Sequence, residues 1–280
     1  MPAREVGACS WSLRARSPEE LVRAARAIGV HSVQLALTPY VDEPEKLEST
    51  VAILARGGIA VRSGMLSTIG EDYSSLDSIR RTGGLRPDEH WKANLARARS
   101  VAGLAKRIGV TLVSFHAGFL PETRASDERR SMIHRLRDVV DAFAAEGARV
   151  ALETGQERAP ILLEVLDDLE RPACGVNFDP ANMILYGMGD PVAALALLAP
   201  RVLQIHVKDA KKTLAPGTWG EEVPVGAGEV DWPAFFDVVR ERRVDVDLMI
   251  EREAGDDRVG DIRTARGLVE RELARIGAGA

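Results

Sequence analysis

Eight short apolar segments alternate with eight helical patterns along this chain, and this rhythm limits its fold more than any other feature. The apolar segments begin near Val6, Ser32, Ala60, Thr111, Val150, Cys174, Val202 and Asp247. The helical patterns lie at about 17–28, 45–56, 89–107, 126–146, 160–169, 190–199, 231–242 and 259–276. Strands that alternate with helices form parallel sheets, and eight such units predict an α/β fold of the closed (β/α)8 TIM barrel type. We expect a single domain over residues 1–280.

Charge and hydropathy exclude two classes of partner. The chain has 42 acidic and 37 Lys and Arg residues, a net charge of −5 and no strongly basic run, which argues against nucleic-acid binding. No apolar run approaches the roughly 18 residues that a membrane span needs, and the first residues contain no apolar export segment. We therefore expect a cytoplasmic protein without a membrane partner. Cys9 and Cys174 fall in apolar segments without zinc-site spacing, which predicts two buried thiols.

Four apolar segments end on a polar side chain, namely Glu153, Asp179, His206 and Glu251. A carboxylate at the end of a buried strand is costly unless something binds it. In a parallel barrel the carboxyl ends of the strands share one face, so these four side chains can converge. Two Glu, one Asp and one His offer nitrogen and oxygen ligands to one divalent cation such as Mn²⁺, Co²⁺, Mg²⁺ or Zn²⁺. Since no thiolate takes part, a structural zinc site is not expected.

A cation flanked by two carboxylates favours proton transfer next to a carbonyl group. The cation polarises a ketone and the neighbouring hydroxyl of a sugar, which lowers the pKa of the adjacent C–H. One Glu removes that proton to give an enediolate, and the other Glu returns a proton. In this hypothesis Glu153 and Glu251 are the acid and base as well as ligands, while Asp179 and His206 are ligands only. The outcome is epimerisation or isomerisation.

Five further residues are candidate substrate contacts, each with a plain structural alternative. His116 ends the fourth strand and faces inward, or is a satisfied core histidine. Glu157 follows the fifth strand and contacts the substrate or solvent. Lys208 faces inward beside His206 and binds substrate or pairs with Glu251. Trp219 covers a sugar face or anchors its long loop, at 210–230, and Asn182 binds a hydroxyl or caps the next turn.

Five segments carry a resemblance to a known family: Leu152–Gly155, Asn177–Asn182, Ile205–Asp209, Val225–Trp232 and Ile250–Glu253. They resemble the sugar phosphate isomerase/epimerase family, the xylose-isomerase-like TIM barrels. In the ketose 3-epimerases of that family Glu, Asp, His and Glu bind the metal, and the two Glu are the acid and base. The resemblance implies these roles for Glu153, Asp179, His206 and Glu251. Relatives often form dimers or tetramers, so the resemblance also allows a homo-oligomer.

The chain departs from the ketose 3-epimerase pattern at three positions that contact the sugar. Asn182 stands where a His is usual, Lys212 where an Arg is usual, and Ala159 where a substrate-binding Glu is usual, with Glu157 as its nearest substitute. The metal site is therefore retained while the sugar contacts differ. We also see no Gly-rich phosphate cradle, which favours a non-phosphorylated sugar.

These departures keep three alternatives open. The first is a lyase or dehydratase of the same superfamily that acts on a keto-sugar, a keto-glycoside or an inosose. The second is a hydrolase like endonuclease IV, because residues 115–118, Phe-His-Ala-Gly, resemble the Phe-His-Pro-Gly of that enzyme. Asn182 in place of a ligand His and the acidic net charge disfavour it. The third is a barrel that binds a sugar without catalysis, which the retention of both Glu153 and Glu251 disfavours.

Overall fold

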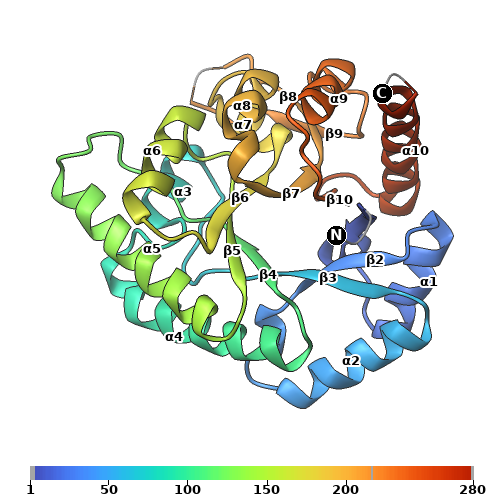
Figure 1. The fold of residues 1–280 in the computed structure, drawn as a ribbon, viewed down its shortest axis with the longest axis horizontal. Helices are drawn as coiled ribbons and strands as arrows, with labels where there is room; N and C mark the ends of the chain where they lie inside the picture. The colour runs from blue at the N-terminus through green and yellow to red at the C-terminus, as the bar shows by residue number, and fades with distance from the viewer. Residues whose placement is uncertain (1–3, 216, 279–280) are drawn as a thin grey trace.

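The computed structural model describes residues 4–215 and 217–278, so residues 1–3, 216 and 279–280 of the expected domain lie outside the described part. Eight parallel strands close into a barrel in the order β1-β10-β7-β6-β5-β4-β3-β2 (Figure 1). The barrel strands are β1 (Val6–Cys9), β2 (Ser32–Ala36), β3 (Ala60–Met65), β4 (Leu112–Phe115), β5 (Arg149–Glu153), β6 (Cys174–Phe178), β7 (Val202–Val207) and β10 (Asp247–Ile250). The predicted TIM barrel is confirmed.

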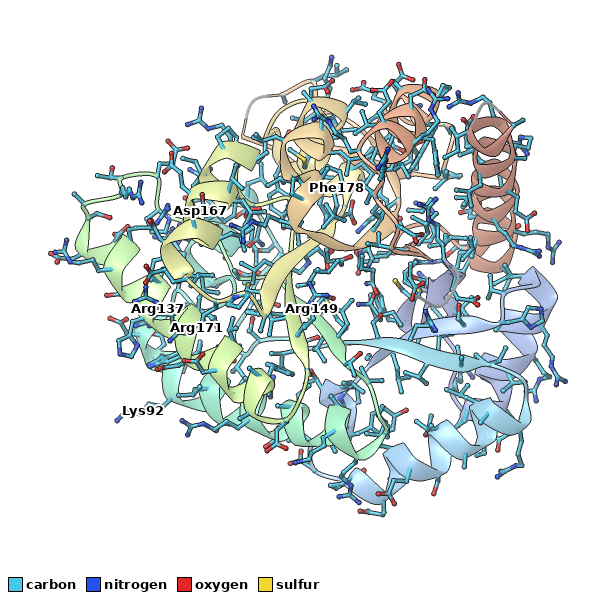
Figure 2. All side chains as sticks on the ribbon, in the orientation of Figure 1. Lys92, Arg137, Arg149, Asp167, Arg171 and Phe178 are labelled. Atoms are coloured by element: carbon cyan, nitrogen blue, oxygen red, sulfur yellow. The ribbon has the colours of Figure 1, made fainter. Side chains whose placement is uncertain are left out.

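A ring of helices covers the outside of the barrel (Figure 1). The covering helices are α1 (Pro18–Ile28), α2 (Pro44–Arg56), α4 (Asp88–Arg107), α5 (Asp127–Ala145), α6 (Ala159–Leu169), α8 (Pro191–Leu198), α9 (Trp232–Glu241) and α10 (Arg258–Gly277). Between barrel and ring lies the apolar core, in which Phe178 of β6, labelled in Figure 2, packs against Phe235 of α9 with 6.0 Å between ring centroids. Within the described residues we find no helix with the length and apolarity to cross a membrane.

Local signals explain where these helices begin and how they are joined. Ser17 caps α1 by accepting a hydrogen bond from the Glu20 N–H, and Pro18 follows at the first helical position. Neighbouring helices are also linked at the surface, where Arg171 donates to Asp141 of α5 with its Nε 2.6 Å from Oδ1 (Figure 2). Such exposed pairs add little stability individually, so burial of the apolar faces of the helices is the main stabilising term.

The connections that follow the strands contain elements that the sequence does not predict. These are α3 (Leu76–Thr82), α7 (Pro180–Tyr186), the antiparallel pair β8 (Asp209–Lys211) and β9 (Glu221–Val223), and the 3-10 turns η1 (Ser10–Leu13) and η2 (Thr38–Tyr40). A further 3-10 turn, η3 (Ala199–Arg201), precedes β7. The long connections at 68–88 and 210–230 are thus structured by α3 and by the β8–β9 hairpin. In a TIM barrel such connections surround the active site.

A layer of polar side chains fills the barrel interior. Gln34, Ser63, Ser114, Asn177 and Gln204 have at most 1% of their surface exposed. They bond across the barrel: Ser63 Oγ donates to Gln204 Oε1 at 2.5 Å, and Gln204 Nε2 donates to Asn177 Oδ1 at 3.3 Å. Strand alternation explains this layer, because side chains two residues apart on a strand lie on the same side. Because buried polar groups need partners, this network fixes the floor on which the site is built.

Candidate metal centre

The four predicted strand ends meet in one buried cluster. Each of Glu153, Asp179, His206 and Glu251 offers one ligand atom, and these atoms all lie within 4.8 Å of one another. His206 Nδ1 lies 3.4 Å from Glu153 Oε1, 3.7 Å from Asp179 Oδ2 and 3.5 Å from Glu251 Oε2. The parallel register explains this convergence, because Glu153 pairs with Asn177 and Asp179 follows two residues later.

The cluster fits a divalent cation by an independent criterion. His206 Nδ1 and Asp179 Oδ2 are buried without a hydrogen-bond partner. Buried polar atoms without a partner are costly, and a cation between them would satisfy both. Metal–ligand bonds of about 2.0–2.2 Å place neighbouring ligand atoms about 3.0–3.5 Å apart, close to the observed separations. Nitrogen and carboxylate ligands suit Mn²⁺, Co²⁺, Mg²⁺ or Zn²⁺.

Gln34 determines which nitrogen of His206 faces the carboxylates. Its Oε1 lies 2.7 Å from His206 Nε2. Its Nε2 donates to the Gly64 carbonyl oxygen at 3.2 Å and to Ser114 Oγ at 2.8 Å. A carbonyl oxygen only accepts, so the Gln34 amide has one orientation and its oxygen faces the ring. Asn177 Nδ2, a donor, also lies 3.0 Å from His206 Nε2. A cation at Nδ1 would require the hydrogen on Nε2, and the acceptor Gln34 Oε1 favours that tautomer.

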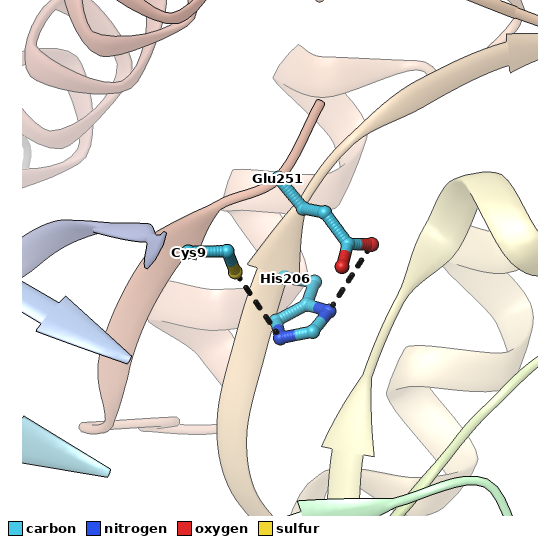
Figure 3. Close-up of side chains that lie close together, drawn as sticks. All are labelled: Cys9, His206 and Glu251. Carbon is cyan, nitrogen blue, oxygen red and sulfur yellow. Dashed lines mark hydrogen bonds and ion pairs between the residues drawn. The ribbon is translucent and has the colours of Figure 1, made fainter. Parts of the chain in front are cut away.

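Cys9 approaches the same ring from another side. Its Sγ lies 3.7 Å from His206 Nε2, whereas Glu251 approaches Nδ1 (Figure 3). Burial raises the pKa of the Cys9 thiol to about 12, so it is neutral at ordinary pH. Cys9 therefore packs behind the imidazole as a neutral thiol. Cys174 is also a buried free thiol, as the sequence predicts.

The two glutamates are held by different groups. Glu153 Oε1 accepts from Asn182 Nδ2 at 3.0 Å and lies 3.4 Å from His116 Nε2. Glu251 Oε1 accepts from Trp11 Nε1 at 2.8 Å, and its Oε2 accepts from Lys208 Nζ at 2.9 Å. Each carboxylate thus has a fixed orientation at the cluster.

Charges within the cluster shift its pKa values in opposite directions. Burial alone would raise the pKa of Glu251, but the charges of Lys208 and His206 outweigh it and hold that pKa well below its usual value. Burial opposes a charge on His206, yet the carboxylates of Glu153 and Glu251 raise its pKa well above the usual value. Burial raises the pKa of Asp179. A cation with two positive charges would take the place of the shared protons.

A cavity of about 540 Å³ adjoins the cluster through Glu251. Its walls come from many segments: Trp11, Ala36, Met65, Leu66, Ser67, Glu71, Tyr73, His116, Asn182, Leu185, Tyr186, Lys208, Trp219, Glu222, Glu251 and Glu253. This volume is within the range of small-molecule sites. Four predicted substrate contacts, His116, Asn182, Lys208 and Trp219, line it.

The other two predicted contacts lie elsewhere. Glu157 is buried and lines a separate cavity of about 240 Å³ together with Phe119 and Met188. Lys212 follows β8 and is exposed. Both positions are in connections, where strand alternation no longer predicts the direction of a side chain.

Several lining residues besides the predicted Trp219 had no signal in the sequence, among them Tyr73, Tyr186 and Glu222. Tyr73 and Trp219 come from the two long connections and stack with 6.5 Å between centroids. Trp219 also meets the edge of Tyr186, on α7, at 4.9 Å. Glu222 lies on the unpredicted strand β9, and Glu253 is the last residue of a segment that carried the family resemblance. Gln34 could have been found, because it is a polar residue in an apolar strand.

The carboxylate of Asp209 holds together two of the segments that carry the family resemblance, Ile205–Asp209 and Val225–Trp232. Its carboxylate accepts from the backbone N–H groups of Ala210, Gly226, Gly228 and Val230 and from Trp232 Nε1, at 2.8–3.3 Å. A Cβ on Gly228 would lie 2.0 Å from Asp209 Oδ1, so only glycine fits there. The segments at 205–209 and 225–232 therefore fold around one buried carboxylate and close the connection after β7.

Solved structures share this fold along nearly the whole chain. A xylose isomerase domain protein from Planctomyces limnophilus superposes with a TM-score of 0.90 at 32% identity, over 99% of this chain and 100% of that chain. The probable 3-DHS dehydratase AsbF from Bacillus anthracis gives 0.73 at 20% identity, over 95% and 98%. An L-ribulose 3-epimerase gives 0.74 at 16% identity, over 99% and 96%.

Two further similarities concern the metal and a curated relative. A xylose isomerase-like TIM barrel protein from Mycobacterium smegmatis, solved in complex with magnesium, superposes with a TM-score of 0.74 at 18% identity over 99% of both chains. The 3-oxo-isoapionate decarboxylase of Pectobacterium atrosepticum is 27% identical over 120 residues, or 41% of this chain and 43% of the relative. The chain thus spans less than half the length of that relative.

The profile described as Xylose isomerase-like TIM barrel matches residues 22–273. This match covers most of the chain and agrees with the closed barrel and with the similarity to the Planctomyces limnophilus protein. The chain belongs to the xylose isomerase-like TIM barrel family.

Proposed function

We propose that the protein is a divalent-metal-dependent sugar isomerase or epimerase that moves a proton on the carbon next to a ketone. The observation that carries this proposal is the pair Glu153 and Glu251. Both are buried, both lie within 3.5 Å of His206 Nδ1, and Glu251 also lines the cavity. Two fixed carboxylates beside one site can serve as the base and the acid of a proton transfer.

The four cluster residues would hold the cation, which is Mn²⁺, Co²⁺, Mg²⁺ or Zn²⁺ in this proposal. Its contribution would be to polarise the substrate carbonyl and to acidify the neighbouring C–H. The magnesium complex of the Mycobacterium smegmatis barrel supports a cation site in this fold. In this proposal Asp179 and His206 contribute ligand atoms only, because both are completely buried, whereas Glu153 and Glu251 each keep 3% of their surface exposed.

The side chains of this protein have distinct tasks in the proton transfer. Glu153, oriented by Asn182 and His116, takes or gives a proton on one side of the substrate carbon. Glu251, oriented by Trp11 and Lys208, acts on the other side. Proton removal on one side and return on the other inverts the carbon, which is the definition of an epimerase. Return to the neighbouring carbon is isomerisation.

A lyase or dehydratase acting on a keto-sugar, keto-glycoside or inosose is the second candidate, because Asn182, Lys212 and Ala159 depart from the ketose 3-epimerase pattern. In such an enzyme, removal of the α-proton would be followed by loss of a hydroxyl or an aglycone from the next carbon. The similarity to a decarboxylase and to a probable dehydratase also supports this candidate. Both candidates share the first step, and only their products differ.

Deuterium exchange tests the shared step. The metal-free protein is reloaded with Mn²⁺ or Co²⁺ in D₂O and given a panel of ketoses, inososes and 3-keto-glycosides, with NMR and mass detection. We expect deuterium next to the carbonyl in the wild type and in the control Glu221→Gln, an exposed carboxylate on β9. In Glu153→Gln we expect exchange to be lost from the epimer whose proton Glu153 removes. Exchange that is undiminished in Glu153→Gln would end the proposal. Stereoisomers as products support the epimerase, and loss of water or an aglycone supports the lyase.

A further inference from the structure

The ionisable side chains that line the cavity are mostly acidic. Four lining residues are carboxylates, Glu71, Glu222, Glu251 and Glu253. Among the lining residues of the described ranges, the basic side chains are Lys208 and His116, and arginine is absent. Arginine is the side chain best suited to bind a phosphate or carboxylate group in two-point fashion. The described walls of this cavity therefore lack the usual means of holding an anionic substrate.

The single ammonium group in these walls is already fully used. Lys208 Nζ donates to Glu253 Oε2 at 2.7 Å, to Glu251 Oε2 at 2.9 Å and to Asn182 Oδ1 at 3.3 Å. An ammonium group has three N–H donors, so none is left for a ligand. An incoming anion would have to break an ion pair that is almost completely shielded from water at Lys208, which is 3% exposed. Such a replacement is unfavourable.

A bound cation would not reverse this balance. It would bring two positive charges to a cluster whose ligands include three carboxylates, those of Glu153, Asp179 and Glu251. The outer walls add Glu71, Glu222 and Glu253, of which Glu222 is paired with Arg252 at 2.8 Å and Glu253 with Lys208 at 2.7 Å. The positive charges at these walls are therefore already matched by carboxylates. A phosphorylated or acidic sugar would find no surplus positive charge there and would be repelled by the nearby carboxylates.

The same walls suit a neutral, hydroxyl-rich molecule. Carboxylate oxygens accept hydrogen bonds from hydroxyl groups, and Glu222 Oε2 lies 4.0 Å from Lys208 Nζ, beyond hydrogen-bond range. The same cavity also has apolar lining, because Tyr73, Tyr186 and Trp219 present aromatic rings to it. Aromatic rings pack well against the C–H face of an uncharged ring.

We infer that the cavity selects uncharged keto-sugars or keto-glycosides over sugar phosphates and sugar acids, and that Glu253 sets this selectivity by occupying Lys208. The inference rests on the proposed function, whose substrate class it narrows. Glu253 is the partner of Lys208 that can be removed most safely, because its side chain is 53% exposed and it is not a member of the four-residue cluster.

Inorganic sulfate is a suitable probe, because it carries two charges and has the shape of a phosphate ester. It is titrated into the Mg²⁺-loaded full chain while NMR follows the indole N–H of Trp11, which donates to Glu251. We expect no saturable shift in the wild type or in Glu221→Ala, the exposed control. Glu253→Ala frees an N–H of Lys208 and should bind sulfate at least about tenfold more tightly, since a hydrogen bond to a charged group is worth roughly this much. Adding Lys208→Met to Glu253→Ala should abolish the gain.

Two results would overturn the inference. One is sulfate binding in the wild type as tight as in Glu253→Ala, and the other is no gain in Glu253→Ala. A matched titration with D-fructose and D-fructose 6-phosphate adds a sugar to the test, and a wild type that binds the phosphate ester more tightly also contradicts the inference. The sulfate titration requires no turnover. Its failure can therefore be distinguished from failure of the deuterium exchange that tests the proposed function.

Discussion

Gln34 Oε1 lies 2.7 Å from His206 Nε2, and this acceptor favours the tautomer in which Nδ1 of the imidazole in the four-residue cluster can bind a cation. The orientation of the Gln34 amide is fixed by the neighbouring strand β3, because its nitrogen donates to the Gly64 carbonyl oxygen. A residue on β2 thus determines that a ligand on β7 presents Nδ1 to three carboxylates. Partners of this kind are known to change metal affinity about 10- to 100-fold.

The first prediction concerns that partner. Gln34→Met keeps the volume of the side chain but removes the acceptor, so Mn²⁺ affinity should fall about 10- to 100-fold. The ¹⁵N shifts of His206 should also show a mixture of tautomers. Gln156→Met is the control, because Gln156 is a buried glutamine whose side chain bonds to Tyr186 rather than to a residue of the cluster. Equal losses of affinity in the two variants would refute the assignment.

The second prediction separates the two glutamates. With Glu251→Gln, epimer formation should fall by about 10²–10⁴, the usual contribution of a general acid or base. Glu153 remains, so deuterium should still enter one of the two epimers without converting it. Glu153→Gln should show the same behaviour with the other epimer. NMR of each pure epimer in D₂O checks this, and a loss of exchange from both epimers in both variants would speak against a two-carboxylate mechanism.

The third prediction follows from the burial of Glu157, which raises its pKa from 4.5 to about 8. The folded state then keeps a proton that the unfolded state releases, so the contribution of Glu157 to stability is fully present below pH 4.5 and is lost as pH rises toward 8. The loss is about 1.4 kcal/mol per pH unit in this window. When the pH rises from 5.5 to 7.5, the free energy of unfolding of the wild type should fall by about 2–3 kcal/mol more than that of Glu157→Gln, which has no ionisable group at this position.

Urea unfolding at the two pH values measures this difference. Glu122→Gln is the control, because Glu122 lines the same small cavity but is 65% exposed. Parallel pH dependence in the wild type and Glu157→Gln would show that Glu157 is ionised in the folded protein.

The fourth prediction concerns Asp209, which accepts hydrogen bonds from four backbone N–H groups and from Trp232. Asp209→Ala leaves these donors without a partner, and the free energy of unfolding should fall by about 3 kcal/mol or more. Asp231→Ala removes only an exposed helix cap and should cost about 1 kcal/mol. Thermal unfolding compares the two variants, and a loss for Asp209→Ala no larger than that of the cap would contradict this role.

The barrel and its cluster could be predicted from the sequence for one physical reason. Parallel strands align their carboxyl ends, so a polar residue at each of four strand ends implies convergence without knowledge of any contact. A second argument concerns the barrel interior. Side chains alternate along a strand, so Asn177 and Gln204 lie on the same side of their strands as Asp179 and His206, and both are buried inside the barrel.

The surroundings of the cluster depend on connections, and there this argument does not apply. The direction of Glu157 is set by burial against α6, and Glu222 reaches the cavity only because a hairpin forms between 209 and 223. Tyr73 and Trp219 meet across two long connections, a contact that no periodicity encodes. Lys212, close in the sequence to the cluster residue His206, is exposed for the same reason.

The central claim is that four strand ends form one site for a divalent cation, and calorimetric titration of the metal-free protein with Mn²⁺ tests it most directly. Asp179→Asn removes a ligand charge, whereas Asp190→Asn changes an aspartate that caps α8 in the way that Asp179 caps α7. Asn retains the cap in both. We predict about one Mn²⁺ per chain in the wild type and in Asp190→Asn, and binding at least about tenfold weaker in Asp179→Asn. Equal Mn²⁺ affinity in all three proteins, or no binding in the wild type, would contradict the account.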